Sequence, residues 1–294
     1  MDVRPSRRGW SLTCPRTFWR CGILWFSRGS YGWIIVLTSP CKRYLRVKWK
    51  LNPKEKPLEP RERLILALDV QTADEAIRLA ESLQPYVGAF KVGLELVHVA
   101  GLSIFEKLRS VGVTRIFYDC KLHDIPNTVG GAMRSIAGHG LWMTNVHAAG
   151  GSRMMRAAAK SLAEGSNGTA PILLGVTVLT SLGAEELNEE LCVPMTPEQY
   201  VVHLAQLAQL SGTNGVVASP LEIEAIRAAC GSEFIIVTPG VRPAGADAGD
   251  QRRTMTPGEA VKRGADYLVI GRAVTAAADP ISAARAIEDE VAQA

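Results

Sequence analysis

The sequence contains no long apolar run, and this absence argues against a membrane-spanning helix. No stretch of 18 or more consecutive apolar residues occurs among the 294 residues, whereas a spanning helix needs ~20. Cysteine is scarce, with six residues at spacings that match neither a disulfide framework nor a zinc site. The composition also lacks the marks of disorder, since 47% of the residues are hydrophobic and 21% are charged. The chain is therefore expected to fold around a sizeable core.

Acidic residues are rare at the start of the chain. Residues 1–61 carry 14 Lys and Arg against 3 Asp and Glu, a balance of +11, whereas residues 62–294 have a balance of −7. Five of the six Trp residues fall in the same basic segment, and no strand or helix periodicity is sustained there. The segment ends in a polar, proline-punctuated stretch, residues 52–60, which is typical of a linker. We therefore divide the chain into residues 1–61 and residues 62–294.

Three interpretations of residues 1–61 remain open. A basic, Ser-containing segment with few acids resembles an organelle transit segment. A basic, Trp-rich arm is also suited to an anionic membrane or to nucleic acid. The interpretation that we favour is a disordered or artefactual extension, because strong compositional bias without periodicity is typical of a segment that does not pack. We assign this extension no function.

Residues 62–294 alternate short, β-branched apolar runs with longer amphipathic ones. This alternation predicts the α/β class, and eight repeats match a (β/α)8 TIM barrel that forms the catalytic domain. A doubly wound open sheet shares the alternation, but no Gly-x-Gly-x-x-Gly follows its first strand. The expected strands are 64–70, 90–96, 116–121, 142–147, 172–179, 215–219, 234–239 and 267–271. The expected helices include 72–83, 126–139, 152–164, 197–210, 221–230 and 257–263.

Polar residues end the expected strands, where barrel enzymes carry their active sites. Asp119 and Lys121 lie two residues apart on one strand and share a face, whereas Cys120 between them faces away. A lysine between carboxylates stays protonated and is able to deliver a proton. An ordinary ion pair would explain Asp-x-Lys alone, but Lys91 on the preceding strand favours a functional cluster. The strand-end residues are Asp69, Lys91, Asp119, Lys121, Asp124, His147, Thr180, Arg242 and Arg272.

The last two expected strands end in residues suited to a phosphate group. Thr238-Pro-Gly-Val-Arg242 ends the seventh strand, and Ile270-Gly-Arg272 ends the eighth. Barrels commonly hold phosphate in the loops after these two strands. Glycine lets backbone N–H groups approach the phosphate, and arginine donates charge-assisted hydrogen bonds. The loop 244–249, rich in small residues, suits a lid that closes over the bound group.

Taken together, the motifs resemble those of the orotidine 5'-phosphate decarboxylase family, in its bacterial form. The resemblance runs from about Leu64 to Asp279 and leaves residues 1–61 outside it. The motifs are Leu66-Ala-Leu-Asp69, Phe90-Lys-Val-Gly93, Asp119-x-Lys-x-x-Asp-Ile-Pro-Asn-Thr128, Val178-Leu-Thr-Ser181, Thr238-Pro-Gly-Val-Arg242, Gly249-Asp-Gln-Arg252 and Ile270-Gly-Arg272.

The resemblance implies decarboxylation of orotidine 5'-monophosphate to uridine 5'-monophosphate (UMP) and CO2, the last step of UMP synthesis, without a cofactor. It implies that Lys121 protonates C6 of the pyrimidine and that Asp119 lies beside the departing carboxylate. It also implies a cytoplasmic homodimer in which Asp124 and Thr128 reach the partner's site. The implied catalytic residues are Lys121, Asp119, Lys91 and Asp124. The implied substrate-binding residues are Asp69, Lys91, Asp119, Thr128, Thr180, Arg242, Gln251, Gly271 and Arg272.

Two rival functions use parts of the same pattern. Sister barrels that process sugar phosphates with Mg²⁺ share Asp-x-Lys-x-x-Asp, but they place a carboxylate ligand where this chain has Lys91, which would repel the metal. A non-catalytic phosphate-binding module would have no use for the cluster of lysines and aspartates. The five histidines lack recognisable ligand spacing, so no metal is expected. Basic residues after 61 are scattered, so neither nucleic acid nor a membrane is an expected partner of the barrel.

Overall fold

The computed structural model describes residues 23–28, 31–38, 43–50, 58–242 and 255–294. The chain forms two compact units, Met1–Pro57 and Leu58–Ala294. The boundary between the units lies just before residue 61, where the composition changes. Residues 58–61 belong with the barrel, since Leu58 packs against apolar side chains of the barrel strands.

The first unit contains an antiparallel sheet of three strands in the order β1-β2-β3. The sequence analysis did not anticipate these strands, because apolar and polar residues alternate only over the short run 45–50. β-Branched and aromatic residues between 31 and 36 nevertheless give the segment strand propensity. The remainder of residues 1–57, for which we expected disorder, lies outside the described residues. The strands are β1 (Ile23–Arg28), β2 (Tyr31–Thr38) and β3 (Arg43–Lys50).

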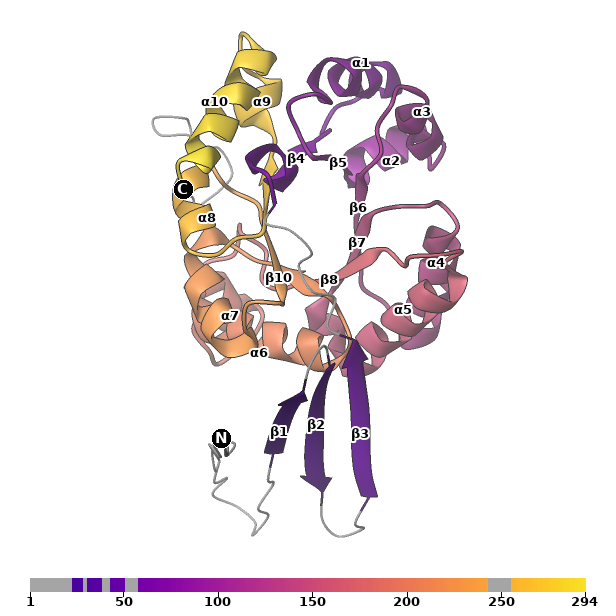
Figure 1. Ribbon diagram of the computed structural model, residues 1–294, viewed down its shortest axis with the longest axis vertical. Helices are drawn as coiled ribbons and strands as arrows, with labels where there is room; N and C mark the ends of the chain where they lie inside the picture. The colour runs from indigo at the N-terminus through magenta and orange to yellow at the C-terminus, as the bar shows by residue number, and fades with distance from the viewer. Residues whose placement is uncertain (1–22, 29–30, 39–42, 51–57, 243–254) are drawn as a thin grey trace, which may run out of the picture. The chain divides into compact units, whose positions relative to one another are not determined.

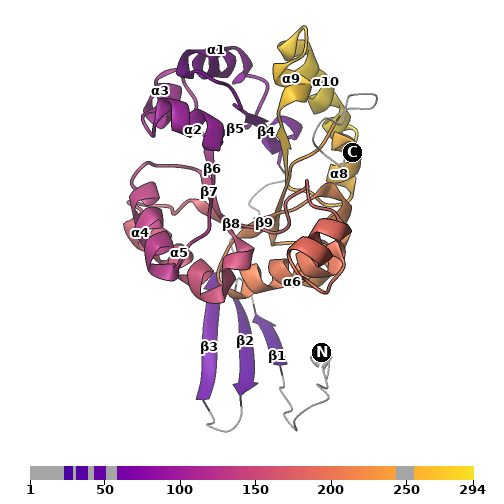
Figure 2. The same ribbon diagram turned by 180° about the vertical axis from the view of Figure 1, so that it is seen from behind.

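The second unit is a closed barrel of eight parallel strands, which confirms the predicted (β/α)8 fold (Figure 1). The strands follow one another around the barrel in chain order, and β11 pairs with β4 to close it. Seen from behind, the helices form the same ring outside the strands (Figure 2). The strands are β4 (Leu64–Ala67), β5 (Ala89–Val92), β6 (Ile116–Leu122), β7 (Met143–His147), β8 (Ile172–Val176), β9 (Gly215–Val217), β10 (Ile235–Thr238) and β11 (Tyr267–Ile270).

Helix boundaries follow local capping chemistry. The Thr72 hydroxyl accepts the Glu75 N–H at 3.2 Å and begins the first helix, and Pro257 opens a later one behind the cap Thr256, both as predicted. None of the helices in the described part of the chain is long and apolar enough to cross a membrane. The helices are α1 (Ala73–Leu83), α2 (Leu94–Ala100), α3 (Ile104–Ser110), α4 (Pro126–Ala137), α5 (Gly151–Gly165), α6 (Pro197–Leu210), α7 (Ile223–Cys230), α8 (Pro257–Lys262), α9 (Arg272–Thr275) and α10 (Pro280–Ala292).

Shorter helical turns join these elements. They are the 3-10 turns η1 (Pro60–Arg63), η2 (Ala148–Gly150) and η4 (Pro220–Glu222), and the π-helical turn η3 (Glu186–Glu190). η1 leads directly into β4, and hydrogen bonds join it to the residues just before β11, the last strand of the barrel. Its last residue, Arg63, donates hydrogen bonds to the carbonyls of Ala265 and Asp266, which precede β11.

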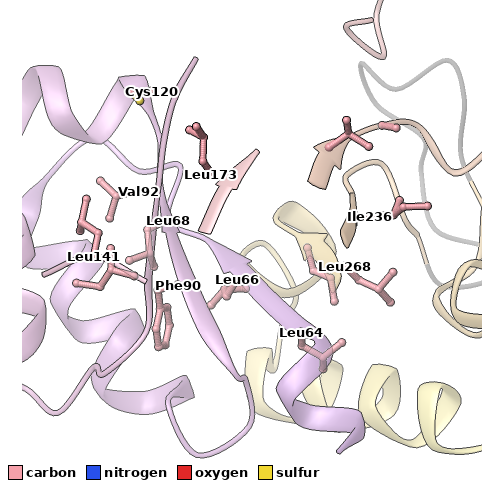
Figure 3. Close-up of a cluster of buried hydrophobic side chains, with 14 of the residues drawn as sticks. Leu64, Leu66, Leu68, Phe90, Val92, Cys120, Leu141, Leu173, Ile236 and Leu268 are labelled. Carbon is pink, nitrogen blue, oxygen red and sulfur yellow. The ribbon is translucent and has the colours of Figure 1, made fainter. Parts of the chain in front are cut away.

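Strand alternation divides the core into two layers. Side chains that face the helices form the larger layer, and alternate residues of the same strands fill the barrel interior. The interior layer contains Ile65, Ala67, Ala89, Phe117, Met143, Leu174, Val237, Tyr267 and Val269. Residues of the helix-facing layer labelled in Figure 3 are Leu64, Leu66, Leu68, Phe90, Val92, Cys120, Leu141, Leu173, Ile236 and Leu268. Inward positions beyond the apolar interior are therefore available for polar groups at the carboxyl ends of the strands.

Candidate active site

A cavity of about 540 Å³ opens at the carboxyl ends of the barrel strands. Most polar residues that line it lie on a strand or in the loop directly after one, whereas Glu95 lies on α2, and Arg272 and Thr275 lie on α9. Phe117 of the barrel interior and the apolar ends of β8 and β9 form the floor. The structure brings eight predicted site residues together around this cavity: Asp69, Lys91, Asp119, Lys121, Thr180, Arg242, Gly271 and Arg272.

Three predicted residues are not in this group. Asp124 lines a second, more open hollow beside Ile125, and its carboxylate accepts the Ile125 N–H at 2.6 Å. Thr128 is exposed in the first turn of α4. Gln251, together with the expected lid at 244–249, lies outside the described residues. The contribution of Asp124 and Thr128 to a partner's site stays a prediction.

Four charged side chains form a continuous network on one side of the cavity. The Asp119 carboxylate lies between two lysines, with Oδ1 2.7 Å from Lys121 Nζ and Oδ2 3.4 Å from Lys91 Nζ. Lys91 Nζ also donates a hydrogen bond of 2.9 Å to Asp69 Oδ1. Charges thus alternate in sign from β4 to β6, which lets neighbours stabilise one another in a water-poor site.

The inner members of the network are buried. Only 10% of the Asp119 side chain and 10% of the Lys91 side chain are exposed, against 30% for Lys121. Burial by itself raises the pKa of Asp119, but Lys91, Lys121 and the amide of Asn145 outweigh it and lower the pKa overall. For Lys91, burial lowers the pKa, and the carboxylates of Asp119 and Asp69 outweigh it and raise the pKa overall. Both residues are therefore charged at neutral pH.

Lys121 has an unusual backbone conformation. Its φ of 47° lies in the left-handed region, which a lysine rarely adopts. The register between β6 and β7 shifts between Tyr118 and Leu122, so the irregularity spans the Asp-x-Lys motif. Such bulges re-aim side chains next to active sites. Here the bulge accompanies the placement of Lys121 and Asp119 on the same side of the cavity.

The opposite side of the cavity is cationic and glycine-rich. Arg242 and Arg272 line it together with Gly240 and Gly271. Gly240 has a φ of 80°, a conformation that favours glycine. The Arg242 N–H donates to the Met255 carbonyl at 3.0 Å, and this bond joins the two described ends of the loop between β10 and α8. The side of the cavity with these two guanidinium groups therefore suits an anion, whereas the side with the four-residue charge network carries charges of alternating sign.

A family model described as the Orotidine 5'-phosphate decarboxylase / HUMPS family matches residues 62–287. The chain belongs to this family. The orotidine 5'-phosphate decarboxylase of Moorella thermoacetica is 50% identical over 255 residues, which cover 86% of this chain and 98% of that protein. That of Heliobacterium modesticaldum is 48% identical and covers 80% and 98%. A crystal structure of orotidine 5'-phosphate decarboxylase from Lactobacillus acidophilus has a TM-score of 0.67 at 37% identity, covering 78% of this chain and 98% of that one.

Membership in the family confirms the resemblance drawn from the motifs. The family match spans the barrel and leaves the first unit outside it. Three curated relatives that are 48–50% identical, each covered almost completely, carry the name orotidine 5'-phosphate decarboxylase. Because the family description also includes the HUMPS branch, the residues of the cavity decide which activity suits this chain.

The sequence analysis missed three residues of this site. Gly93 leaves room for the network, since a Cβ atom there would lie 2.9 Å from Lys91 Nζ and 3.2 Å from Asp69 Oδ1. Glu95, in the first turn of α2, lines the cavity. Asn145 is fully buried on β7 and contacts Asp119 and Lys121. The signal for Asn145 was its place two residues before His147, at an inward position of its strand.

Three further polar residues, Cys120, His123 and His147, lie near the site but do not line its cavity. Cys120 faces the helices, as predicted, with Sγ 3.3 Å from the Thr144 hydroxyl. The rings of His147 and His123 lie 5.5 Å apart, and burial, His123 and Lys121 lower the pKa of His147. No three His, Cys, Asp or Glu side chains gather as a metal site within the described ranges.

Proposed function

We propose that the protein converts orotidine 5'-monophosphate to UMP and CO2, the last step of UMP synthesis. The observation that carries this proposal is the ammonium of Lys121, held 2.7 Å from Asp119 inside a cavity whose far side is cationic. Family membership and decarboxylase relatives of about half-identical sequence support it. The charge network suits the reacting end of such a nucleotide, and the arginines suit its phosphate.

Lys121 is the proposed acid. Loss of CO2 leaves an electron pair on C6 of the pyrimidine, and an adjacent ammonium stabilises the developing negative charge before it transfers a proton to that carbon. The bond between C6 and the carboxyl carbon breaks, a bond between C6 and hydrogen forms, and Lys121 becomes a neutral amine that water reprotonates. Asp119 holds the Lys121 ammonium in place, 2.7 Å from its carboxylate, and would lie beside the departing carboxylate.

Lys91 and Asp69 are proposed to bind the ribose and to complete the network. Lys91 is anchored from both sides by Asp69 and Asp119, so its ammonium has little freedom to move. Such preorganised charges act on the transition state without reorganising at the moment of reaction. The Asp69 side chain is 51% exposed, which leaves its carboxylate accessible to ribose hydroxyls.

Phosphate binding is proposed for the residues at the other side of the cavity. Arg242 and Arg272 supply charge, Gly271 lets the phosphate approach the backbone, and Thr180 contacts the ligand near the base. Gln251 is proposed for the same group from the sequence motif alone. Binding energy gained at this non-reacting end is available to close the site around the reacting carbon.

We further propose a cytoplasmic homodimer that needs no metal or organic cofactor. The proton comes from a lysine and the electrostatic stabilisation from fixed side chains, so the chemistry is complete with protein groups. Asp124 and Thr128 lie outside their own cavity, which suits a role in a partner's site. In the sugar-phosphate branch of the family a Mg²⁺ ion would meet the Lys91 ammonium, and the repulsion disfavours that activity here.

The direct test is an ultraviolet assay of orotidine 5'-monophosphate consumption by the full-length protein in the presence of EDTA. We expect turnover that EDTA does not reduce and UMP as the product. Absence of turnover by a folded protein would overturn the decarboxylase proposal. Activity on a sugar phosphate with Mg²⁺, and its loss with EDTA, would assign the chain to the other branch.

A further inference from the structure

Asn145 links the two residues of the Asp-x-Lys motif. Its Nδ2 donates to Asp119 Oδ1 at 2.7 Å, and its Oδ1 accepts the backbone N–H of Lys121 at 2.7 Å. The side chain is fully buried on β7, and both partners lie on β6. One amide thus holds the carboxylate of the first residue and the backbone of the second.

The orientation of this amide is fixed by its partners. The N–H of Lys121 is only a donor, so it requires the oxygen of Asn145. The ionised carboxylate of Asp119 is only an acceptor, so it requires the nitrogen of Asn145. No other amino acid of this size supplies one donor and one acceptor in this arrangement, since aspartate lacks the donor when ionised and leucine lacks both groups.

The hydrogen bond to Lys121 replaces one that the sheet does not make. The pairing of β6 with β7 shifts register between Tyr118 and Leu122, and Lys121 within the shift has a φ of 47°. A left-handed lysine persists only where its surroundings hold it there. Asn145 gives the N–H of Lys121 a hydrogen-bond partner. A buried N–H group without such a partner would lower the stability of the fold.

We propose that Asn145 is a positioning residue of the decarboxylation, which sets the distance between the Asp119 carboxylate and the Lys121 ammonium. This inference rests on the proposed function of Lys121 as acid. Asn145 does not line the cavity, so it acts through its two partners. Asn145 therefore contributes to the chemical step. The proposed phosphate-binding residues belong to β10, β11 and the loops that follow them.

A buried residue of the same strand provides the comparison for a merely structural role. Thr144 is also fully buried and donates from its hydroxyl to the Tyr118 carbonyl of β6 at 3.1 Å, but it faces the helices. The variant T144V removes this hydrogen bond and the contact of the Thr144 hydroxyl with Cys120 Sγ, and it leaves the four charged side chains of the network in place. It therefore measures what loss of the buried β6–β7 contacts of one side chain does to stability and activity.

The experiment compares wild type, N145A, N145D and T144V in full-length protein, with kcat and KM measured for orotidine 5'-monophosphate and folding checked by thermal melting. For N145A we expect kcat to fall about 100-fold with KM changed less than about threefold, since misplaced reacting groups cost rate far more than binding. T144V should keep kcat within about twofold of wild type, because it leaves the reacting groups in place. Turnover by wild type tests the proposed function itself, and the variants are judged relative to it.

The pH dependence of kcat in N145D is a measurement that a merely structural role of Asn145 would not change. It also tests the proposal if N145A does not fold. N145D keeps the acceptor for Lys121 but places a second carboxylate against Asp119, and two such carboxylates share a proton at low pH. A protonated Asp at 145 restores the lost donor. The other ionisable groups nearby are Asp69, Lys91, Cys120, Lys121, His147 and His123, which wild type shares, so the ratio of the two rates isolates the change.

We expect the kcat of N145D, divided by that of wild type, to rise as the pH falls from 8 to 5. A ratio that stays constant over this range would overturn the inference. Equal losses of kcat in N145A and T144V would also overturn it, since they would show that any buried bond between these strands matters as much.

Discussion

Lys121 Nζ lies 2.7 Å from Asp119 Oδ1, although the two residues share one strand and Lys121 has left-handed backbone geometry. In a regular strand, side chains two residues apart stand parallel, several ångströms from each other. The bulge in β6 accompanies the closer approach of these two groups. The distance between the proposed acid and its carboxylate partner therefore depends on backbone geometry as well as on the identity of the two side chains.

Replacing Lys121 by alanine should abolish turnover while the protein stays folded. The variant loses both the ammonium that stabilises the developing charge and the proton that quenches it, so we expect kcat to fall by ~10³-fold or more. The matched control is K160A, because Lys160 is an exposed lysine paired with Glu164 on α5. The measurement is the ultraviolet assay, and a K121A enzyme as active as K160A would remove Lys121 from the role of acid.

Replacing Arg272 by alanine should weaken nucleotide binding. A charge-assisted contact with phosphate contributes ~1.5–3 kcal/mol, so the Kd for UMP should rise by at least about tenfold. Titration calorimetry with UMP gives that constant directly. The control is R263A, which removes a partly exposed arginine paired with Glu224. Equal affinities of R272A and wild type would contradict the phosphate assignment.

Replacing Gly93 by alanine should disturb the charge network. The added methyl group would lie 2.9 Å from Lys91 Nζ, so the ammonium has to move away from Asp69 or Asp119. We expect kcat to fall about tenfold or more, as misplacement of reacting groups does. In G131A the new methyl group meets no atom within 4 Å in the middle of α4. That control should keep wild-type kcat, and a G93A enzyme that matches it would show that the network tolerates displacement.

Mixing two inactive variants tests the shared site. In a heterodimer of K121A and D124A, one site lacks both groups and the other retains both, provided that Asp124 serves the partner's cavity. Random exchange of subunits should then restore about a quarter of the wild-type activity. Activity is measured after mild denaturation and refolding of the mixture. A mixture as inactive as its two components would show that Asp124 serves the site of its own subunit.

Acid should destabilise the protein partly through His147. Burial, His123 and Lys121 lower its pKa in the folded state, so the unfolded chain binds a proton at a higher pH than the folded chain does. The free energy of unfolding should therefore decrease as the pH falls from the usual histidine pKa of ~6.5 toward the lowered pKa. Urea titrations at pH 7.5 and 5.5 should show a smaller decrease for H147Q than for wild type. Equal decreases would show that His147 does not titrate differently on folding.

The barrel was predictable because its strands obey a simple rule. Alternate residues of each strand face the interior, so Asp119 and Lys121 could be assigned to one face and Cys120 to the other from spacing alone. The strand ends were less accurate, since apolar residues continue across the turn into the next helix. The expected strand 90–96, for example, ends at Val92, and α2 begins at Leu94 behind Gly93.

The sequence could place Asn145 at an inward position of its strand, but it could not predict which groups Asn145 contacts. Its importance depends on the register between β6 and β7 and on the left-handed backbone of Lys121, and neither follows from local periodicity. Gly93 was quoted in a motif, but its function as empty space became visible only from the positions of Lys91 and Asp69. The cluster of charged residues at the strand ends could be predicted, whereas the hydrogen bonds of Asn145 and the space left by Gly93 depend on the three-dimensional structure.

The pairing of the last barrel strand with the first has a consequence for protein synthesis. β11 pairs with β4, so Arg272 and Asp69, which follow these two strands, line the cavity from neighbouring strands. A chain that ends before residue 267 lacks the strand that pairs with β4, together with the residues after that strand that line the cavity. An unpaired strand edge invites association with other chains. We therefore expect such a truncated chain to lack one wall of the cavity and to expose an edge suited to aggregation.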